Sequence, residues 1–180
     1  MAIRLSLKTE SADPICYGEL DSPIGPLLLA ATPKGICGVH FGRFREQEAE
    51  LRRWSQRHLP GSPWVLQPEA VAHAAKQLDE YFAGRRTEFD LELDLYGTPF
   101  QLKVWNALRR IPYGTTASYK QIGQMIGSEK AVRAIGGANN RNPVSIIVPC
   151  HRVIGADGSL VGYGGGLNIK QFLLKRENAI

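Results

Sequence analysis

Three short apolar runs, separated by turn-forming residues, occupy the front of this 180-residue sequence. The runs cover residues 15–20, 26–32 and 36–41, and the connections at 21–25 and 33–35 both contain Pro and Gly. Runs of this length are typical of strands, and connections this short join antiparallel neighbours. The front of the chain is therefore predicted to form an antiparallel meander.

Helical patterns follow the meander. Residues 43–59 are highly charged with few apolar positions, and residues 69–82 place apolar side chains at helical spacing before Gly84. Pro and Gly at 60–63 separate the two predicted helices. Residues 87–95 alternate apolar and acidic side chains, which fits either a strand of period two or an extended linker.

The back half opens with strong helix signals. Thr98 is a good N-cap, Pro99 suits the first helical position and Gln101 completes a capping box. Two shorter helices are predicted at 118–126 and 128–140, and such a closely joined pair is typical of a helix-turn-helix. The predicted fold is α/β (α+β): an N-terminal domain at 1–92 with an antiparallel β-sheet and helices, and a mostly helical C-terminal domain at 93–180.

The charges divide unequally between these two parts. Residues up to Leu95 carry 11 Lys and Arg against 14 Asp and Glu, whereas residues from Tyr96 onward carry 11 against 3. A net charge of +8 on the back half favours contact with a polyanion. A nucleic-acid partner is favoured over the alternative that the excess charge only keeps the surface soluble.

The second helix of the predicted pair has few large side chains. Residues 131–140 are mostly Ala, Gly and Asn, and Arg133 is their one long polar side chain. Adjacent Gly residues are costly inside a helix unless something approaches it closely. That partner is either another segment of the protein or a DNA backbone, and small residues suit the minor groove better than the major groove.

A Cys-His pair comes directly after an apolar run that is predicted to be a core strand. Cys150, His151 and Arg152 are consecutive, and a cation beside a thiol favours the nucleophilic thiolate. Neighbours on a strand point to opposite faces, so His151 reaches Cys150 only if the chain bends or through a water. Glu177, one of three acids in this half, is a candidate to orient His151. The alternative is an inert core thiol.

Several motifs accompany Pro149-Cys150-His151-Arg152-Val153. They are Asp21-Ser22-Pro23-Ile24-Gly25-Pro26-Leu27, Thr98-Pro99-Phe100-Gln101, Ser118-Tyr119, Ala131-Val132-Arg133-Ala134-Ile135-Gly136, Asn142-Pro143 and Gly162-Tyr163. With these motifs spread over nearly the whole chain, the sequence resembles the O6-alkylguanine-DNA alkyltransferases. Members of that family are repair proteins that move an alkyl group from guanine in DNA onto their own Cys.

The resemblance implies a role for each matching residue. Cys150 would accept the alkyl group, His151 would act as its base through a water, and Glu177, on the final helix, would orient His151. Asn142 would hold the active-site turn. Tyr119 would help to rotate the target nucleotide out of the duplex and touch the flipped base.

The remaining matches concern DNA and the base pocket. Arg133 would fill the space that the flipped base leaves, and the other expected DNA contacts are Ser118, Tyr119, Ala131, Gly136 and Arg141. The guanine pocket would be lined by the Val153 carbonyl, Tyr163, Gly164 and Ser145. Ser145 and Gly164 stand where some members have Pro and Ser, and both positions bear on pocket size.

The resemblance also implies the reaction and its setting. The partner would be double-stranded DNA that contains O6-alkylguanine, and also O4-alkylthymine, and each Cys150 would react once. No cofactor is expected, because a thiolate attacks an alkyl carbon unaided. No metal is expected either, because Cys37 and His40 point to opposite faces of a strand and Thr32 and Cys37 replace the ligands of zinc-binding members.

The resemblance implies a monomer. A cytoplasmic location is expected because the first ten residues show no secretory signal and no run is long enough to span a membrane. Two rival functions remain at this point. Alkyltransferase-like proteins bind damaged DNA without transfer because their Cys is replaced, whereas Cys150 is present here. A Cys-His-Glu hydrolase would turn over repeatedly, but it explains neither the helix pair nor the basic half.

Overall fold

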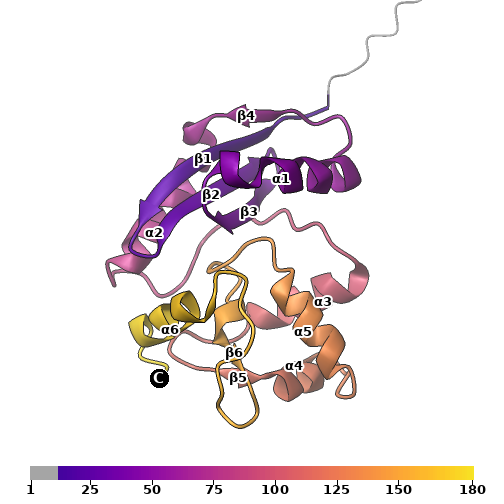
Figure 1. The fold of residues 1–180 in the computed structure, drawn as a ribbon, viewed down its shortest axis with the longest axis vertical. Coiled ribbons are helices and arrows are strands. Elements are labelled where there is room, and N and C mark those ends of the chain that lie inside the picture. Colours follow the sequence, from indigo (N-terminus) through magenta and orange to yellow (C-terminus); the bar gives the residue numbers. More distant parts are fainter. Residues whose placement is uncertain (1–11) are drawn as a thin grey trace, which may run out of the picture.

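The computed structural model describes residues 12–180. A sheet with its helices forms one part of the molecule, and a group of helices forms the other, below the sheet in Figure 1. The predicted absence of a secretory signal concerns residues 1–10, which lie outside the described range. Within residues 12–180, no helix is both long and apolar enough to cross a membrane.

The predicted meander is confirmed, and a fourth strand extends it. The elements of this part are β1 (Ile15–Ser22), β2 (Gly25–Thr32), β3 (Gly35–Phe41), α1 (Phe44–His58), β4 (Trp64–Leu66), the short 3₁₀ helix η1 (Pro68–Val71) and α2 (Ala72–Phe82). The strand order is β3-β2-β1-β4, and β4 runs parallel to β1. Sequence reasoning missed β4 because three residues between prolines show no readable periodicity.

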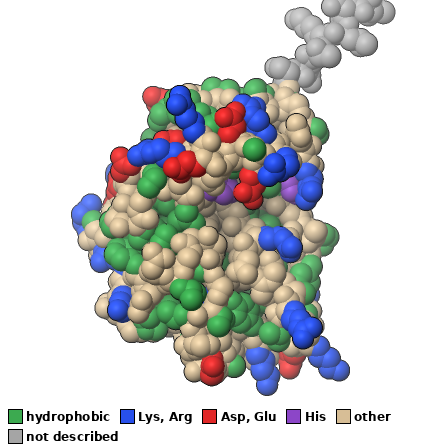
Figure 2. All heavy atoms as spheres, viewed as in Figure 1, with side chains coloured by type: hydrophobic (Ala, Val, Ile, Leu, Met, Phe, Trp, Pro, Cys, Tyr) green, Lys and Arg blue, Asp and Glu red, His purple; other side chains and the backbone are tan. Residues whose placement is uncertain are grey.

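Helices cover both faces of the sheet. On β2, Leu28 packs with Phe44 and Leu51 of α1, whereas Leu27 and Leu29 belong to the main core, which includes α2 and the helical part. All three leucines of β2 are fully buried. The continuous apolar run of β2 is therefore explained by burial on both sides. Figure 2 shows carboxylates gathered mainly on the sheet part of the visible face.

The helical part begins with the predicted capping box. Its elements are α3 (Pro99–Leu108), β5 (Ala117–Ser118), α4 (Tyr119–Met125), α5 (Val132–Asn140), the 3₁₀ helix η2 (Cys150–Arg152), β6 (Val153–Ile154) and α6 (Leu167–Arg176). The Thr98 hydroxyl accepts from Gln101 N at 3.2 Å, and Gln101 Oε1 accepts from Thr98 N at 2.9 Å. The α/β class predicted from the sequence is confirmed.

The second helix of the pair starts later than predicted. Residues 128–131 form a turn closed by the bond from Ala131 N to Ser128 O at 3.0 Å, and α5 begins only at Val132. Gly127, with a φ of +67°, ends the first helix, and the turn that follows it occupies the residues predicted to begin the second. α4 and α5 still pack together. Gly123 of α4 has no side chain, so the backbone of the turn at residues 128–129 can lie directly against it.

The predicted core strand before Cys150 is wrong. Residues 142–149 form a buried loop whose backbone groups bond within the loop, as in Val148 N to Val144 O at 2.9 Å. The loop also docks on β3, where Val39 N donates to Pro143 O at 2.9 Å and Ser145 N donates to Val39 O at 3.3 Å. An apolar run thus reports burial and not strand geometry. For residues 87–95, the structure shows the second of the two predicted alternatives, an extended linker and not a strand. It makes one isolated β-bridge, between Leu93 and Ile36.

Candidate active site

Cys150 is the first residue of η2, and the residue is 4% exposed. Its Sγ accepts a hydrogen bond from Asn142 Nδ2 at 3.1 Å. Asn142 also donates to Val148 O at 2.8 Å and accepts from Val144 N at 3.0 Å. The amide therefore ties the buried loop to the sulfur. Burial raises the pKa of Cys150, and the Asn142 hydrogen bond and the charge of Lys170 oppose that rise.

His151 is fully buried and faces Glu177. Its Nε2 lies 2.7 Å from Glu177 Oε1, and its buried Nδ1 has no hydrogen-bond partner among the described residues. Burial lowers the pKa of His151, against the opposing effect of Glu177. The imidazole is therefore neutral near pH 7, with one nitrogen committed to the carboxylate. The 3₁₀ turn supplies the bend that a Cys-His pair on a strand would lack.

Glu177 is the centre of a buried network. It was predicted on the final helix, but it lies one residue beyond the end of α6, at the C-cap. Oε1 accepts from Tyr81 OH at 2.7 Å, and Arg152 donates from Nε to Oε2 at 2.7 Å and from Nη2 to Oε1 at 3.1 Å. Burial alone would raise the pKa of Glu177, but the hydrogen bonds from His151 and Arg152 lower it to about 2.

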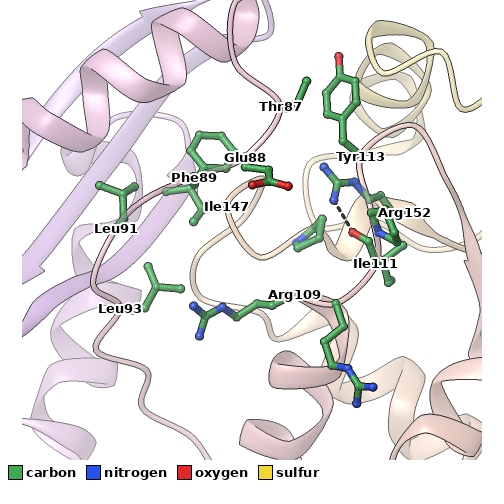
Figure 3. A pocket seen from close by; sticks show the side chains of 13 residues that line it. Thr87, Glu88, Phe89, Leu91, Leu93, Arg109, Ile111, Tyr113, Ile147 and Arg152 are labelled. Atoms are coloured by element: carbon green, nitrogen blue, oxygen red, sulfur yellow. Dashed lines mark hydrogen bonds between the residues drawn. The ribbon is translucent and has the colours of Figure 1, made fainter.

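Arg152 does not serve the thiol, contrary to the expectation that the neighbouring cation stabilises the thiolate. Its guanidinium turns to Glu177 and donates from Nη1 to Ile111 O at 2.6 Å. Figure 3 shows it on the wall of a cavity of about 370 Å³ between the 87–93 linker and the loop after α3. Phe89, Leu91 and Ile147 also line this cavity, which lies on the arginine side of the network and is not lined by Cys150 or His151.

The cation that acts on Cys150 is Lys170, which sequence reasoning missed. Its side chain on α6 is fully buried, and Nζ donates to the carbonyls of Val153 and Val161. Burial lowers the pKa of Lys170 to about 8, against the opposing effect of Cys150. A detectable signal was present: Lys170 shares a helix face with Leu173 and Leu174, and a lysine on an apolar face needs buried partners.

Two residues predicted to contact the flipped base, Val153 and Tyr119, lie next to Lys170, because Val153 O and Val161 O both accept hydrogen bonds from its Nζ. Tyr119 OH donates to Val161 O at 3.4 Å, and the Tyr163 ring packs edge-on against Phe41 of β3 with centroids 5.6 Å apart. The buried Tyr163 hydroxyl has no hydrogen-bond partner among residues 12–180. The other two, Ser145 and Gly164, differ in exposure, since Ser145 is buried in the loop on β3 and Gly164 is exposed.

The predicted DNA-facing residues gather on α4 and α5. Arg133 is exposed near the start of α5, Ala131 is its N-cap residue and Arg141 is exposed at its C-cap. Ser118 caps α4 by accepting from Gln121 N at 3.2 Å. A Cβ built on Gly136 would first meet the Tyr119 ring at 3.8 Å, which is ordinary contact.

The glycines of α5 are therefore not explained by a close protein neighbour. At Gly137 the first atom that an added Cβ would meet is a flexible Arg141 nitrogen at 3.5 Å, whereas at Gly123 a backbone atom lies at 3.0 Å. A second segment of the protein was one of the two partners considered for this helix, and residues 12–180 do not provide one that requires these glycines. The outer face of α5 stays open to an external partner.

A metal site is not assembled from the described residues. Among residues 12–180, no three His, Cys, Asp or Glu side chains come together as potential ligands. Cys37 is buried, and burial raises its pKa to about 12. Its thiol therefore behaves as part of the core.

Both halves of the chain match one known family. Residues 15–95 match the family described as 6-O-methylguanine DNA methyltransferase, ribonuclease-like domain, and residues 99–179 match its DNA binding domain. The methylated-DNA–protein-cysteine methyltransferase of Methanosarcina acetivorans is 49% identical over 163 residues, which cover 91% of this chain and 98% of that protein. The Mycobacterium tuberculosis protein of the same name is 50% identical over 165 residues, covering 92% and 93%.

Solved structures agree with the sequence relatives. The crystal structure of Mycobacterium tuberculosis OGT in complex with DNA superposes with a TM-score of 0.78 at 47% identity, covering 91% of this chain and 93% of that one. The O6-methylguanine-DNA methyltransferase of Pyrococcus kodakaraensis shares the fold with a TM-score of 0.63 at 24% identity. The chain therefore belongs to the 6-O-methylguanine DNA methyltransferase family and is a methylated-DNA–protein-cysteine methyltransferase of DNA repair.

Proposed function

We propose that the protein moves an alkyl group from O6 of guanine in double-stranded DNA to Sγ of Cys150, once per molecule. The observation that carries the proposal is a buried thiol that accepts a hydrogen bond from Asn142 and is followed in the chain by a buried His151–Glu177 pair. A thiolate is the nucleophilic form of Cys, and a neighbouring imidazole held by a carboxylate is the usual means of making one.

The reaction is a displacement at the alkyl carbon. The S–C bond forms as the bond from that carbon to O6 breaks, and the electron pair of the broken bond stays with the guanine. The thiol proton passes to Nδ1 of His151 through a water. His151 then gives up one proton through water as the guanine anion takes one up, so the nucleobase ends as neutral guanine and His151 is neutral again. Because a thioether is a poor leaving group, Cys150 is consumed and no cofactor is required.

The DNA-binding role is assigned to α4 and α5. Base chemistry on a duplex requires the target nucleotide to leave the stack, at a cost of a few kcal/mol. Tyr119 would contact the rotated nucleotide, and its hydroxyl would donate a hydrogen bond near N3 of that base. Arg133 would fill the space that the nucleotide leaves in the duplex. Support comes from the exposed Arg133, from Gly136 and Gly137, where an added Cβ would meet no atom of residues 12–180 closer than 3.5 Å, and from the solved complex of the Mycobacterium tuberculosis relative with DNA.

The remaining assignments concern specificity and assembly. The base pocket would be lined by the Val153 carbonyl, Tyr163 and Gly164, and Ser145 would limit the size of the alkyl group. O4-alkylthymine would be a second substrate. Ser118, Ala131, Gly136 and Arg141 would contact DNA. We further propose that the chain acts as a monomer and that the boundary between its two domains lies between residues 92 and 93.

The test is a mass measurement on the intact protein. Excess duplex that contains O6-methylguanine is mixed with the protein, and repair is followed to completion. We expect a gain of one methyl group, located on the Cys150 peptide, and repair that stops at one equivalent. Cys150→Ser should bind the duplex without transfer, and Cys16→Ser should behave as the unchanged protein.

Three outcomes would reject the proposal. Repair beyond one equivalent would indicate a turnover enzyme such as a hydrolase. An unmodified Cys150 with the damaged duplex still bound would indicate a binding protein. A methyl group on another residue would displace Cys150 from its role.

A further inference from the structure

One hydrogen bond to the His151–Glu177 pair comes from the sheet part of the molecule. Tyr81 lies in α2, and its hydroxyl donates to Glu177 Oε1 at 2.7 Å. The same oxygen lies 2.7 Å from His151 Nε2. Tyr81 and Glu177 are buried, with exposures of 0% and 1%, so water does not compete for this hydrogen bond.

The position of Tyr81 is fixed from two directions. Its ring packs against Phe89 of the linker, with centroids 5.5 Å apart, and against Tyr113, with centroids 6.3 Å apart. Its backbone carbonyl accepts from Nε and Nη2 of Arg176, each at 3.2 Å. Arg176 precedes Glu177 in the chain, so α2 holds both the end of α6 and the carboxylate that follows it.

We infer that Tyr81 is a positioning residue for alkyl transfer: its hydroxyl holds Oε1 of Glu177 against His151 and takes up part of the carboxylate charge. The inference rests on the proposed role of His151 and Glu177. It assigns the sheet part of the protein a direct share in the chemistry, through one side chain that reaches across the molecule.

The hydroxyl is a donor over the whole working pH range. Burial and the neighbouring Glu177 both raise the pKa of Tyr81, so the phenol stays protonated. Among residues 12–180, the charged or titratable groups around the His151–Glu177 pair and Tyr81 include Arg152 from η2, Tyr113 from the loop after α3, Tyr163 from the loop after β6 and Lys170 from α6. Of these, Arg152 balances the carboxylate as a cation, whereas Tyr81 does so as a neutral donor.

Loss of the hydroxyl has two predictable consequences. Negative charge concentrates on Oε1, so the pKa of His151 rises and the acidic limb of the pH–rate profile moves to higher pH. The carboxylate also loses one of the contacts that orient it. Hydrogen bonds to charged groups commonly matter by about tenfold in rate or more.

The experiment compares Tyr81→Phe with a matched control, Tyr96→Phe. Tyr96 OH also donates to a carboxylate, Asp94 Oδ2, but away from the His151–Glu177 pair. Single-turnover methyl transfer from O6-methylguanine duplex is measured from pH 5.5 to 9, together with the ring signals of His151 by NMR, duplex affinity and Tm. We expect Tyr81→Phe to be about tenfold slower with a raised His151 pKa and unchanged duplex affinity, and Tyr96→Phe to change only Tm.

A second variant guards against misfolding of Tyr81→Phe. Site-specific 3-fluorotyrosine at position 81 keeps the size of the ring and makes the phenol a stronger donor. It should lower the pKa of His151 and move the acidic limb to lower pH, opposite to Tyr81→Phe. No movement of the limb with the fluorinated ring would overturn the inference.

Glu177→Gln separates this inference from the proposed function on which it rests. If Glu177→Gln is slow and Tyr81→Phe keeps the rate and pH profile of the unchanged protein, Tyr81 only packs and the inference fails. If Glu177→Gln itself transfers at the normal rate, the role proposed for the His151–Glu177 pair fails.

Discussion

Replacement of Asn142 by Ala should make the Cys150 thiol less acidic. The amide of Asn142 donates to Sγ at 3.1 Å, in a site where burial already raises the pKa of the thiol. A hydrogen bond to a charged group contributes about 1.5–3 kcal/mol. Since one pKa unit corresponds to about 1.4 kcal/mol, the pKa of Cys150 should rise by about 1–2 units.

The rate of alkylation should fall by less than the thiolate population. At a pH below the thiol pKa, a rise of 1–2 units lowers the thiolate fraction by about 10- to 100-fold. A more basic thiolate is also a better nucleophile, with a Brønsted coefficient of about 0.4–0.5. The net rate with a small alkylating reagent should therefore fall by roughly 3- to 16-fold.

Iodoacetamide labelling from pH 6 to 10, read on the Cys150 peptide by mass spectrometry, gives both the pKa and the rate. The control is Asn106→Ala, the same change at an exposed position of α3. Asn142→Asp is a second variant, because it keeps an acceptor for Val144 N at 3.0 Å but sets a carboxylate beside the sulfur. Its thiol pKa should rise further than that of Asn142→Ala.

The reasoning is refuted if Asn142→Ala folds normally and the pKa of Cys150 stays within about 0.3 units of its original value, because even the weakest charged hydrogen bond predicts more. A lower thiol pKa in Asn142→Asp than in Asn142→Ala would refute it as well.

Three further predictions concern DNA, the buried lysine and acid stability. Arg133→Ala should slow transfer from duplex O6-methylguanine but leave transfer from the free base unchanged; an equal loss with both would reject its role in the stack. Lys170→Met should raise the pKa of Cys150, by labelling, and speed amide exchange in residues 153–162, because Nζ bonds two carbonyls there. The free energy of unfolding should fall on acidification, first below pH 6.5 as the unfolded chain protonates groups such as His151, whose folded pKa is lowered. It should fall again between about 4.5 and 2 as Glu177 protonates, by about 3 kcal/mol in all for that carboxylate; urea unfolding of Glu177→Gln should lack this second loss.

Elements with local causes were predicted correctly from the sequence. The helix that starts at Pro99 is set by a capping box within four residues, and the structure shows both of its bonds. The meander at 15–41 is set by short turns that allow only neighbouring strands to pair. In both cases the interacting groups are close along the chain, so the local sequence pattern is enough to predict the element.

Elements with distant causes were predicted poorly. The apolar residues before Cys150 are buried because their loop threads between β3 and the helices, and hydrophobicity alone does not distinguish such a loop from a strand. β4 pairs with β1 between residues 49 positions apart in the sequence, as in the pairing of Ile15 with Trp64. The start of α5 at Val132 depended on how the turn after Gly127 closes.

The site divides along the same line. Sequence alone determined that Cys150 and His151 are neighbours, that the back half is basic, and, by resemblance, that Glu177 belongs with them. Only the tertiary structure decided that Arg152 binds Glu177 and not the thiol, that Lys170 is the buried cation whose charge acts on Cys150, and that Tyr81 completes the carboxylate's hydrogen bonds. A buried charge must find partners wherever the fold brings them, and residues such as Tyr81 and Glu177, 96 positions apart, meet only after the chain has folded.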